Sequence, residues 1–569
     1  MVGPPFLVTF LFMICLIMIP LAVAETRHYT WEVTYQYKYL DCHRKLAITI
    51  NGLTPGPNIS AVQGDKIIVN VINGLVMENV AIHWHGIQQR GTPWSDGTDG
   101  VTQCPIVPGE NYTYEFVVDK AGSYMCHSHY GMQREAGLYG LIIVSLPAGE
   151  SEPFSYDHDH GIVLSDWYHH SAYDHATRLS SKPFEWIGEP QSLLINGRGK
   201  YDCTGIHSSV CNSSLPQCSP FALTVIPGIT YRLRIASLTS LSALSFQIED
   251  HMMKVVEADG NYVEPFLVEN LYIYSGETYS VLVTADKDST RNYWMSLNVV
   301  SREPNTTNAL AILKYDDPNH PHEFTPSTNP PPGPRWDDNK SRIEQSSAIK
   351  ALQGHFQTPP ENSDKEIILL NTQNTINGYT KWALNNVSFA LPNTPYLIAL
   401  KGNIRDAFDP TPPPETYDTE NYDIYSVANN TNAISRTGIY KLEFGSTVDI
   451  ILQNSNTMKN ETSETHPWHL HGHDFWVLGY GEGKFNLKTD VNKYNLVNPI
   501  MKNTVPLHPY GWTALRFKAD NPGVWLFHCH IEAHFFMGMF VVFEAGVEKV
   551  GDMPKSSLGC GKSKYLIAP

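Results

Sequence analysis

The stretch from residue 523 to residue 539 holds the side chains best suited to chemistry: His528, Cys529, His530, His534 and Met539. Its apolar, aromatic composition predicts a strand, in which successive side chains point to opposite faces. His528 and His530 then face one side and Cys529 the other. One cysteine, two histidines and a weakly bound methionine make up the ligand set of a blue-copper electron-transfer site. Cys529, His534 and Met539 supply three of these four ligands, and the flanking histidines can serve a second metal site.

Three further His-x-His pairs stand, like this one, in apolar or aromatic surroundings near a glycine. The four pairs of this kind are His83/His85, His127/His129, His469/His471 and His528/His530. At strand spacing, both members of a pair point to the same face. A single histidine in apolar sequence is usually a packed core residue, but eight in pairs indicate a multi-metal site. They are enough for a cluster of three copper ions, and His466 is left to complete the blue-copper site.

The chain also contains an internal repeat that separates the two kinds of site. Residues 122–129 align with residues 523–530, and residues 83–86 align with residues 469–472. The first unit lacks the blue-copper ligands, because other residues stand in their places: Val80 for His466, Ser128 for Cys529, Gln133 for His534 and Leu138 for Met539. The paired histidines of the first and last units must therefore converge, whereas the blue-copper site belongs to the last unit alone.

Four motifs carry a resemblance to a known family. They are His-Trp-His-Gly at 83–86, His-Ser-His at 127–129, His-Pro-Trp-His-Leu-His-Gly-His at 466–473, and His-Cys-His at 528–530 with His534 and Met539 behind it. Over the whole mature length the sequence resembles the three-domain multicopper oxidases, and among them it is most similar to the plant ascorbate oxidases. The resemblance implies an all-β protein of three cupredoxin-like Greek-key β-barrel domains.

The resemblance also implies four copper ions per chain and a ligand for each. The type 1 copper would be held by His466, Cys529, His534 and Met539, and the type 2 copper by His83 and His469. The type 3 pair would be held by His85, His127, His129, His471, His528 and His530. Electrons would pass from Cys529 through the backbone to the two neighbouring histidines.

The implied activity is the one-electron oxidation of L-ascorbate to monodehydroascorbate, with reduction of O2 to water. An axial methionine such as Met539 tends to give a milder oxidant than a non-coordinating residue, which suits an easily oxidised donor. The aromatic positions that flank the family's substrate pocket match Trp186 and Trp382, with His534 as the group that receives electrons. The alternative is a laccase-type oxidase of phenols on the same copper sites.

Two rivals have other functions: a non-catalytic cell-wall relative that has lost its ligands, and a copper carrier or ferroxidase. Every ligand is present here, which argues against the first. The second needs acidic groups near the type 1 histidines, and no motif assigns one. Protons for O2 reduction could come through Asp96, Asp99 or Glu532, which adjoin the ligand motifs. These carboxylates could instead fix the histidine tautomers.

Length and charge set the broad class. The chain has 569 residues, 42% of them hydrophobic, which is long enough for about three domains. The net charge of -17 argues against nucleic acid or an anionic membrane as partner. Residues 1–24 read as a secretory signal, and no later apolar run reaches the roughly 18 residues of a membrane span. We expect a secreted, extracellular protein of the apoplast or cell wall, with ascorbate and O2 as partners and a homodimer left open.

The elements that must position the ligands are short strands separated by Gly, Pro and Asn, which is typical of an antiparallel sandwich or barrel. We expect domains at 25–147, 148–325 and 336–569, with a stiff proline-rich linker between the last two. In the second domain, residues 292–298 are the counterpart of the ligand strand. They contain no His or Cys, so this domain holds no copper and acts as spacer and wall.

Cysteines and glycosylation acceptors agree with a secretory route. The acceptors are Asn58, Asn111, Asn212, Asn305, Asn339, Asn386, Asn429 and Asn460. Sequence alone does not fix the cysteine connectivity. The family resemblance implies the disulfides Cys42–Cys218, Cys104–Cys560 and Cys203–Cys211, and leaves Cys126 as a buried, unpaired thiol.

Overall fold

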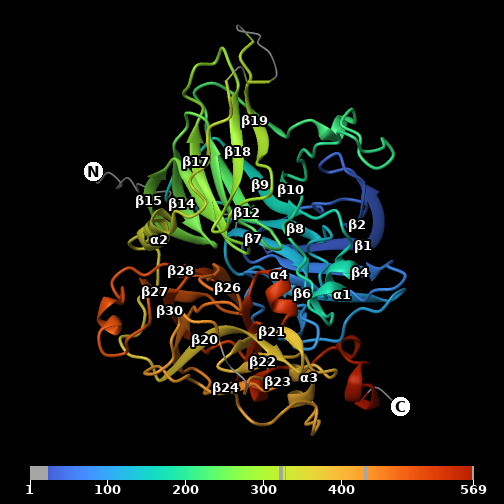
Figure 1. Ribbon diagram of the computed structural model, residues 1–569, viewed down its shortest axis with the longest axis vertical. Helices are drawn as coiled ribbons and strands as arrows, with labels where there is room; N and C mark the ends of the chain where they lie inside the picture. The colour runs from blue at the N-terminus through green and yellow to red at the C-terminus, as the bar shows by residue number, and fades with distance from the viewer. Residues whose placement is uncertain (1–23, 319–324, 327, 429–431, 567–569) are drawn as a thin grey trace, which may run out of the picture.

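The computed structural model describes residues 24–318, 325–326, 328–428 and 432–566. The predicted signal segment lies outside the described residues except for residue 24, and so does the acceptor Asn429. Figure 1 shows three bodies that meet at the centre, blue for the first part of the chain, green for the middle and yellow to red for the last. Each body is built from packed β-sheets, which confirms the prediction of an all-β protein with three cupredoxin-like domains. Among the described helices, none has the length and apolar character needed to cross a bilayer.

The first domain pairs a sheet of order β2-β1-β4-β6 with a sheet of order β3-β8-β7-β5. Buried residues alternate with more exposed ones along β4 and β6, so one face of each strand packs into the core. The elements are β1 (Thr26–Lys38), β2 (Lys45–Ile50), β3 (Ile59–Val62), β4 (Lys66–Asn73), β5 (Ile82–His85), η1 (Pro93–Ser95), β6 (Asn111–Val117), β7 (Gly122–Ser128) and β8 (Tyr139–Ser145).

The second domain has a sheet of order β10-β9-β12-β17-β14-β15 packed on one of order β11-β19-β18-β13-β16. Its elements are β9 (His158–Trp167), α1 (Ala172–Leu179), β10 (Ser192–Ile195), η2 (Pro216–Cys218), β11 (Ala222–Val225), β12 (Thr230–Ser237), β13 (Ala243–Ile248), β14 (Met253–Ala258), β15 (Asn261–Val268), β16 (Asn270–Ile273), β17 (Thr278–Thr284), β18 (Tyr293–Val300) and β19 (Ala309–Tyr315).

The third domain has a sheet of order β23-β22-β21-β20-β25-β30-β27-β28 and one of order β24-β32-β31-β26-β29. Its strands are β20 (Lys365–Ile376), β21 (Tyr379–Leu384), β22 (Val387–Phe389), β23 (Ile434–Arg436), β24 (Tyr440–Leu442), β25 (Thr447–Gln453), β26 (His466–Leu470), β27 (Phe475–Glu482), β28 (Met501–Lys502), β29 (Thr504–Leu507), β30 (Gly511–Lys518), β31 (Gly523–Cys529) and β32 (Phe540–Ala545). Its helical elements are α2 (Asn339–Ala348), α3 (Tyr396–Lys401), η3 (Asp490–Lys493), α4 (Glu532–Phe536), η4 (Val547–Lys549), η5 (Lys555–Ser557) and η6 (Gly561–Leu566).

The three domains share one strand pattern. In each, the first sheet contains a parallel pair, β1 with β4, β9 with β12 and β20 with β25. In each, the second sheet begins with another parallel pair, β3 with β8, β11 with β19 and β24 with β32. Strands β7, β18 and β31 are therefore equivalent. The predicted counterpart of the ligand strand in the second domain is confirmed as β18, which carries no His or Cys.

The ligand strands differ from ordinary edge or surface strands in their burial. All seven residues of β7 and of β31 are buried, as are all residues of β5 and β26. One face of each packs into its own domain, and the other face is covered by a neighbouring domain. A strand that is buried on both faces does not alternate between polar surface residues and apolar core residues. In these strands the face that would otherwise meet solvent meets another domain, and the histidines lie on that face.

Two of the three expected disulfides are formed. Cys104–Cys560 ties the first domain to the C-terminal segment across 456 residues of sequence, and Cys203–Cys211 closes a short loop in the second domain. A bond that joins distant parts of the chain restricts the unfolded state most.

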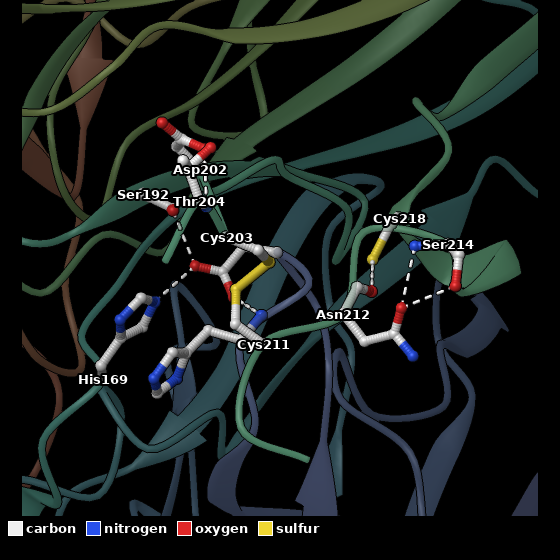
Figure 2. Close-up of a disulfide and its surroundings, with 11 residues drawn as sticks. His169, Ser192, Asp202, Cys203, Thr204, Cys211, Asn212, Ser214 and Cys218 are labelled. Atoms are coloured by element: carbon white, nitrogen blue, oxygen red, sulfur yellow. Dashed lines mark hydrogen bonds and ion pairs between the residues drawn. A yellow bond between two sulfur atoms is a disulfide. The ribbon is translucent and has the colours of Figure 1, made fainter. Parts of the chain in front are cut away.

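The prediction of the third disulfide is wrong. Cys42 and Cys218 are both free and buried. The Cys218 thiol lies beside the backbone carbonyl of Asn212, with 3.2 Å between Sγ and O (Figure 2). Burial raises the pKa of Cys218 to about 12, and the neighbouring Cys42 adds to the shift. The side chain is therefore a neutral thiol held by a carbonyl oxygen rather than a partner in a bond.

The predicted glycosylation acceptors lie at positions of differing exposure. Asn58, Asn111, Asn305, Asn339 and Asn460 are exposed, whereas Asn212 and Asn386 are partly buried. Their occupancy stays a prediction.

Gly97 provides a test of how the first domain places its ligand strand. It has a φ of +81°, and a Cβ built there would lie 1.7 Å from the carbonyl oxygen of Ile82, the first residue of β5. The change Gly97→Ala must therefore displace the strand that carries His83, and overpacking of this kind costs about 1–3 kcal/mol. We expect the thermal midpoint to fall by roughly 5 °C more than in Gly91→Ala. Gly91 is the matched control, because it has a φ of +78° and no atom within 4 Å of the added Cβ. Equal midpoints in the two variants would contradict this view.

Candidate metal centre

The first group of donor atoms lies inside the third domain. His466 begins β26, Cys529 ends β31, and His534 lies in α4. The Nδ1 atoms of the two histidines are 3.2 Å apart, and the Sγ of Cys529 is 3.7 Å from each of them. Met539 is fully buried in the same core, and its backbone N–H donates to the carbonyl of His534 at 3.0 Å. These atoms form a triangle around a space that suits a single ion.

The second group draws on two domains. Three pairs of imidazoles face each other through Nε2: His83 with His469 at 3.3 Å, His127 with His530 at 3.3 Å, and His471 with His528 at 3.1 Å. Two nitrogens bound to one ion at about 2 Å with a tetrahedral angle lie roughly 3.3 Å apart. The first two pairs join the first domain to the third, so this centre exists only when the domains are assembled.

The β-sheet register explains how the pairs arise. In the first domain His83 lies opposite His127, and in the third domain His469 lies opposite His528. The two ligand hairpins repeat one arrangement, and they meet face to face. His83 then stacks on His471 with 3.8 Å between ring centroids, and His85 stacks on His469 with 3.6 Å.

The outward nitrogens of these rings are bonded, which fixes which nitrogen is free to bind a metal. Four rings have their Nδ1 atom 2.8–3.0 Å from a backbone carbonyl oxygen. These are the rings of His83, His127, His469 and His528. His471 instead donates from Nδ1 to the Asp96 carboxylate at 2.9 Å. His85 is reversed, because its Nε2 lies 3.1 Å from both Asn503 Oδ1 and Thr504 Oγ1.

Buried nitrogens without a partner point to an ion. Among the described residues, the Nδ1 atoms of His85 and His129 are buried and have no hydrogen-bond partner. An unpaired buried polar atom is costly, so these rings fit a role as metal ligands. The three-residue groups that could hold an ion are His83/His85/His469, His85/His127/His530, His129/His471/His528, His83/Asp96/His471 and His466/Cys529/His534. The donor set fits copper, because imidazole and thiolate are ligands that copper prefers.

Burial keeps these rings in the form that binds metal. Desolvation lowers the pKa well below the usual range for seven of them, His85, His127, His129, His469, His471, His528 and His530. It lowers the pKa of His466 to about 3. A neutral imidazole has a free lone pair, so the cluster is prepared for a cation near pH 7.

Comparison with known proteins decides the family. Models of the multicopper oxidase family match residues 32–149, 158–318 and 407–549. The chain belongs to the multicopper oxidase family. It is 51% identical to an L-ascorbate oxidase of Cucurbita maxima over 99% of this chain and 98% of that protein, and 52% identical to one of Cucumis sativus over 95% and 93%. Laccase-12 of Arabidopsis thaliana is 33% identical over 94% of each chain.

Solved structures of multicopper oxidases have the same fold. A laccase from Botrytis aclada superimposes with a TM-score of 0.76 at 29% identity, covering 93% of this chain and 89% of that one. Fet3p, a multicopper oxidase that functions in iron import, gives 0.75 at 26% identity and covers 94% of each chain. As a multicopper oxidase, the protein is an oxidoreductase whose buried histidine clusters serve copper binding.

The predicted proton groups lie in different settings. The Asp96 carboxylate contacts two rings of the centre, at 2.9 Å from His471 Nδ1 and 3.4 Å from His83 Nδ1. Asp99 lines a separate cavity of about 550 Å³ that reaches His129, and burial raises its pKa to about 6. Asp96 thus orients ligands, whereas Asp99 is a half-buried acid in a cavity that His129 also lines. Their part in proton transfer stays a prediction.

Glu532 acts on the centre through its neighbours. Its carboxylate accepts the backbone N–H groups of Arg134 and Glu135, each at 2.9 Å. Arg134 in turn donates to the His530 ring at 2.8 Å and to its carbonyl oxygen. Burial raises the pKa of Glu532 to about 7. The contacts link the first and third domains beside His530, and a relay through Glu532 stays a prediction.

The predicted substrate residues differ in access. Trp186 is 37% exposed, and its ring centroid is 6.5 Å from that of His534. Trp382 is 1% exposed, with its ring against both His534 and His466 at 4.7 and 5.0 Å. Trp382 therefore packs under the two imidazoles, and only Trp186 of the pair lines the cavity on the solvent side.

Two residues of that cavity are found by the structure alone. The cavity holds about 80 Å³ and includes Glu464 and Arg302 as well as Trp186. Glu464 is 42% exposed and lies 3.3 Å from Nε2 of His534. Partial burial raises its pKa, but the hydrogen bond from His534 and the charges of His534, His466 and Arg302 together outweigh this and lower the pKa to about 2. The only feature of the sequence that could have indicated Glu464 is its position two residues before His466. Arg302 belongs to another domain, and no motif near it indicates this cavity.

Asp96→Asn tests whether the carboxylate orients the histidines that the first and third domains share. The amide keeps the size but removes the charge that faces His471 and His83, and such changes cost about 10–100-fold in metal affinity or activity. We expect reoxidation by O2 to slow by about tenfold in stopped-flow experiments, while reduction of the blue copper keeps its rate. Asp41→Asn is the control, because Asp41 is fully buried and bonds His169 at 2.7 Å, away from the centre. An equal slowing of both half-reactions would contradict the assignment.

Proposed function

We propose that this protein is a secreted oxidase that transfers electrons from L-ascorbate, one at a time, to O2 and yields monodehydroascorbate and water. Three features support the proposal: the complete set of ligand residues, the cavity beside His534, and the greater similarity to L-ascorbate oxidases than to laccases. The facing imidazoles of the first and third domains are the observation that carries it.

We propose that the chain binds four copper ions with the following ligands. Type 1 copper takes His466, Cys529, His534 and Met539, and type 2 takes His83 and His469. The type 3 pair takes His85, His127 and His530 for one ion and His129, His471 and His528 for the other. The two triads of the type 3 pair correspond to two groups whose donor atoms lie within 4.8 Å of one another. Four bound ions would store the four electrons needed to convert one O2 into two waters.

The chain itself provides the electron route. His534 lies against the cavity wall, so an electron donor there is close to the type 1 ligands. Cys529 lies between His528 and His530 in sequence, and its side chain points the other way. The backbone of three consecutive residues thus joins the two sites. The rings of His528 and His530 hold their positions through Cys529 O and through Ser275 and Arg134.

The cavity suits a small anionic donor. Arg302 is held in place by Glu189 at 2.6 Å and by the carbonyl oxygen of Leu241 at 3.2 Å. Its guanidinium lines the same cavity as Glu464, an ionised carboxylate that accepts a hydrogen bond from His534 and can accept another from a hydroxyl group of the donor. Ascorbate is an anion at neutral pH with acidic hydroxyl groups, so it matches both residues.

Two alternatives bear on the same cavity. A laccase acting on phenols would use the same copper ligands and does not need Arg302. A ferroxidase would need an uncompensated acidic group, and Glu464 is an acidic group beside His534. Because Arg302 pairs with Glu189, the charges of this cavity wall do not by themselves select an anion or a cation. The choice of ascorbate follows from the 51% identity to an L-ascorbate oxidase, against 26% to the iron-import oxidase Fet3p.

The remaining parts of the proposal concern organisation. We place the domains at residues 25–147, 148–325 and 336–569, with secretion directed by residues 1–24 and glycans at the acceptor asparagines. The copper-free second domain separates the other two along the chain and covers their junction.

Oxygen uptake by copper-loaded protein tests the activity. We expect the specificity constant with ascorbate to exceed that with a neutral phenol by at least about tenfold, because only the anion gains the interaction with Arg302. Removal of copper by a chelator should abolish both uptake and blue colour, and added copper should restore them. Similar efficiency with both donors would leave a general oxidase instead.

Arg302→Gln tests the recognition of the anion. Loss of a charge-assisted hydrogen bond of about 1.5–3 kcal/mol should raise the KM for ascorbate by roughly 10–100-fold and leave oxidation of a neutral phenol unchanged. Arg291→Gln is the matched control, because Arg291 has the same 25% exposure and also pairs with a glutamate, but lies outside the cavity. An unchanged KM in Arg302→Gln would remove this residue from the substrate site.

A further inference from the structure

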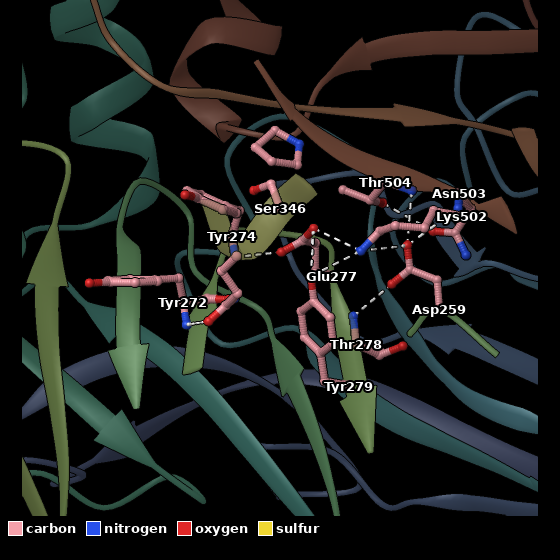
Figure 3. Close-up of polar contacts among 12 residues, drawn as sticks. Asp259, Tyr272, Tyr274, Glu277, Thr278, Tyr279, Ser346, Lys502, Asn503 and Thr504 are labelled. Atoms are coloured by element: carbon pink, nitrogen blue, oxygen red, sulfur yellow. Dashed lines mark hydrogen bonds and ion pairs between the residues drawn. The ribbon is translucent and has the colours of Figure 1, made fainter. Parts of the chain in front are cut away.

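A buried charge cluster lies between the second and third domains, beside the segment that contacts two of the proposed copper ligands (Figure 3). Lys502 ends β28, and its Nζ donates to Glu277 Oε1 at 2.8 Å and lies 3.6 Å from Asp259 Oδ2. Tyr279 adds its hydroxyl at 3.2 Å from the same Nζ. All three charged residues are 1% exposed. Burial of three charges is costly, so the arrangement calls for a reason beyond stability.

Asp259 holds the backbone that follows Lys502. Its Oδ2 accepts the N–H groups of Asn503 at 3.3 Å and Thr504 at 3.1 Å, and its Oδ1 accepts the N–H of Thr278 at 2.9 Å. One carboxylate of the second domain thus binds the start of β17 in its own domain and two consecutive residues of the third domain. Figure 3 shows this carboxylate between the two segments.

Asn503 and Thr504 are the residues that orient two copper ligands. The Asn503 side-chain oxygen and the Thr504 hydroxyl each lie 3.1 Å from His85 Nε2, which leaves Nδ1 of that ring as the free nitrogen. The carbonyl of Asn503 lies 2.8 Å from His469 Nδ1, which leaves Nε2 facing His83. A shift of this short segment would therefore turn one ligand from each domain.

The turn before β17 of the second domain reaches a third ligand. Ser275 Oγ lies 2.9 Å from His530 Nδ1, and Gly276 has no room for a Cβ, which would lie 2.9 Å from the His530 ring. Glu277 comes next and binds Lys502. A few consecutive residues of the copper-free domain thus contact the ligand framework on two sides.

We propose that Asp259, Glu277 and Lys502 are positioning residues through which the copper-free second domain sets the orientation of His85 and His469. The second domain then acts as part of the trinuclear site's support and not only as a spacer. This inference rests on the copper centre proposed above, and it concerns residues that bind no copper themselves.

Asp259→Asn is the test, with Asp449→Asn as the matched control. An amide presents only one oxygen, so the N–H groups on one side of residue 259 lose their acceptor. The backbone at 259 has a φ of +47°, which asparagine tolerates as aspartate does, so no new strain arises. Asp449 is 4% exposed and binds Arg516 through both oxygens at 2.6 and 2.7 Å, away from the centre.

The readout is copper spectroscopy and not activity alone. In Asp259→Asn we expect the blue absorption of type 1 copper to be retained. The type 2 electron paramagnetic resonance signal should change its hyperfine splitting, and copper should dissociate from the trinuclear sites about tenfold more readily. Asp449→Asn should lose a similar amount of thermal stability and keep the wild-type type 2 signal.

The spectra of Asp259→Asn support or overturn the positioning role. Wild-type spectra and copper retention in folded Asp259→Asn would overturn the positioning role while leaving the copper centre intact. If Asp259→Asn does not fold, Glu277→Gln replaces it, because it weakens the hold on Lys502 without removing an acceptor from Asn503 or Thr504; an unchanged type 2 signal there overturns the proposal. A wild-type protein without copper at these histidines would instead refute the proposed function.

Discussion

The structure depends on bringing buried neutral imidazoles from two domains together with their free nitrogens inward. His83 and His127 belong to the first domain, and they face His469 and His530 of the third at 3.3 Å. The Nδ1 atoms of His85 and His129 in the same cluster are buried without a partner, which is unfavourable. Copper relieves this cost, and the fold, the domain order and the buried contacts all serve the meeting of the two ligand hairpins.

Strand geometry connects this cluster to the group formed by His466, Cys529 and His534. Alternation along β31 turns Cys529 into the third domain and His528 and His530 toward the first. The two sites are therefore adjacent through backbone but separated by side-chain direction. The first domain repeats the strand with Ser128 in place of the cysteine, and its serine hydroxyl bonds Gln133. The same strand thus contributes to two groups of donor atoms in the third domain, where it is β31, and to one group in the first domain, where it is β7.

The environment of the ligands comes from distant parts of the chain. Asp96 and Arg134 of the first domain contact His471 and His530 of the third, and Ser275 of the second domain also contacts His530. Nearly every imidazole is thus oriented by a residue that carries no copper. In metal sites such outer contacts determine tautomer and basicity almost as strongly as the ligands do. The cavity beside His534 follows the same rule, because Arg302 and Trp186 reach it from the second domain.

The sequence by itself determined the all-β class, the repeat, and the candidate ligand residues with their pairing at strand spacing. These features are local, since ligand type and two-residue periodicity are read within a few positions. It also indicated the copper-free strand that became β18. Only the tertiary structure decided which residues meet across domains: Asp96 with His471, Glu464 with His534, and Asp259 with the Asn503–Thr504 segment. It also left Cys42 and Cys218 as free thiols, and it buried Trp382 beneath the ligands. Such contacts depend on how folded domains pack, and no spacing along the chain encodes them.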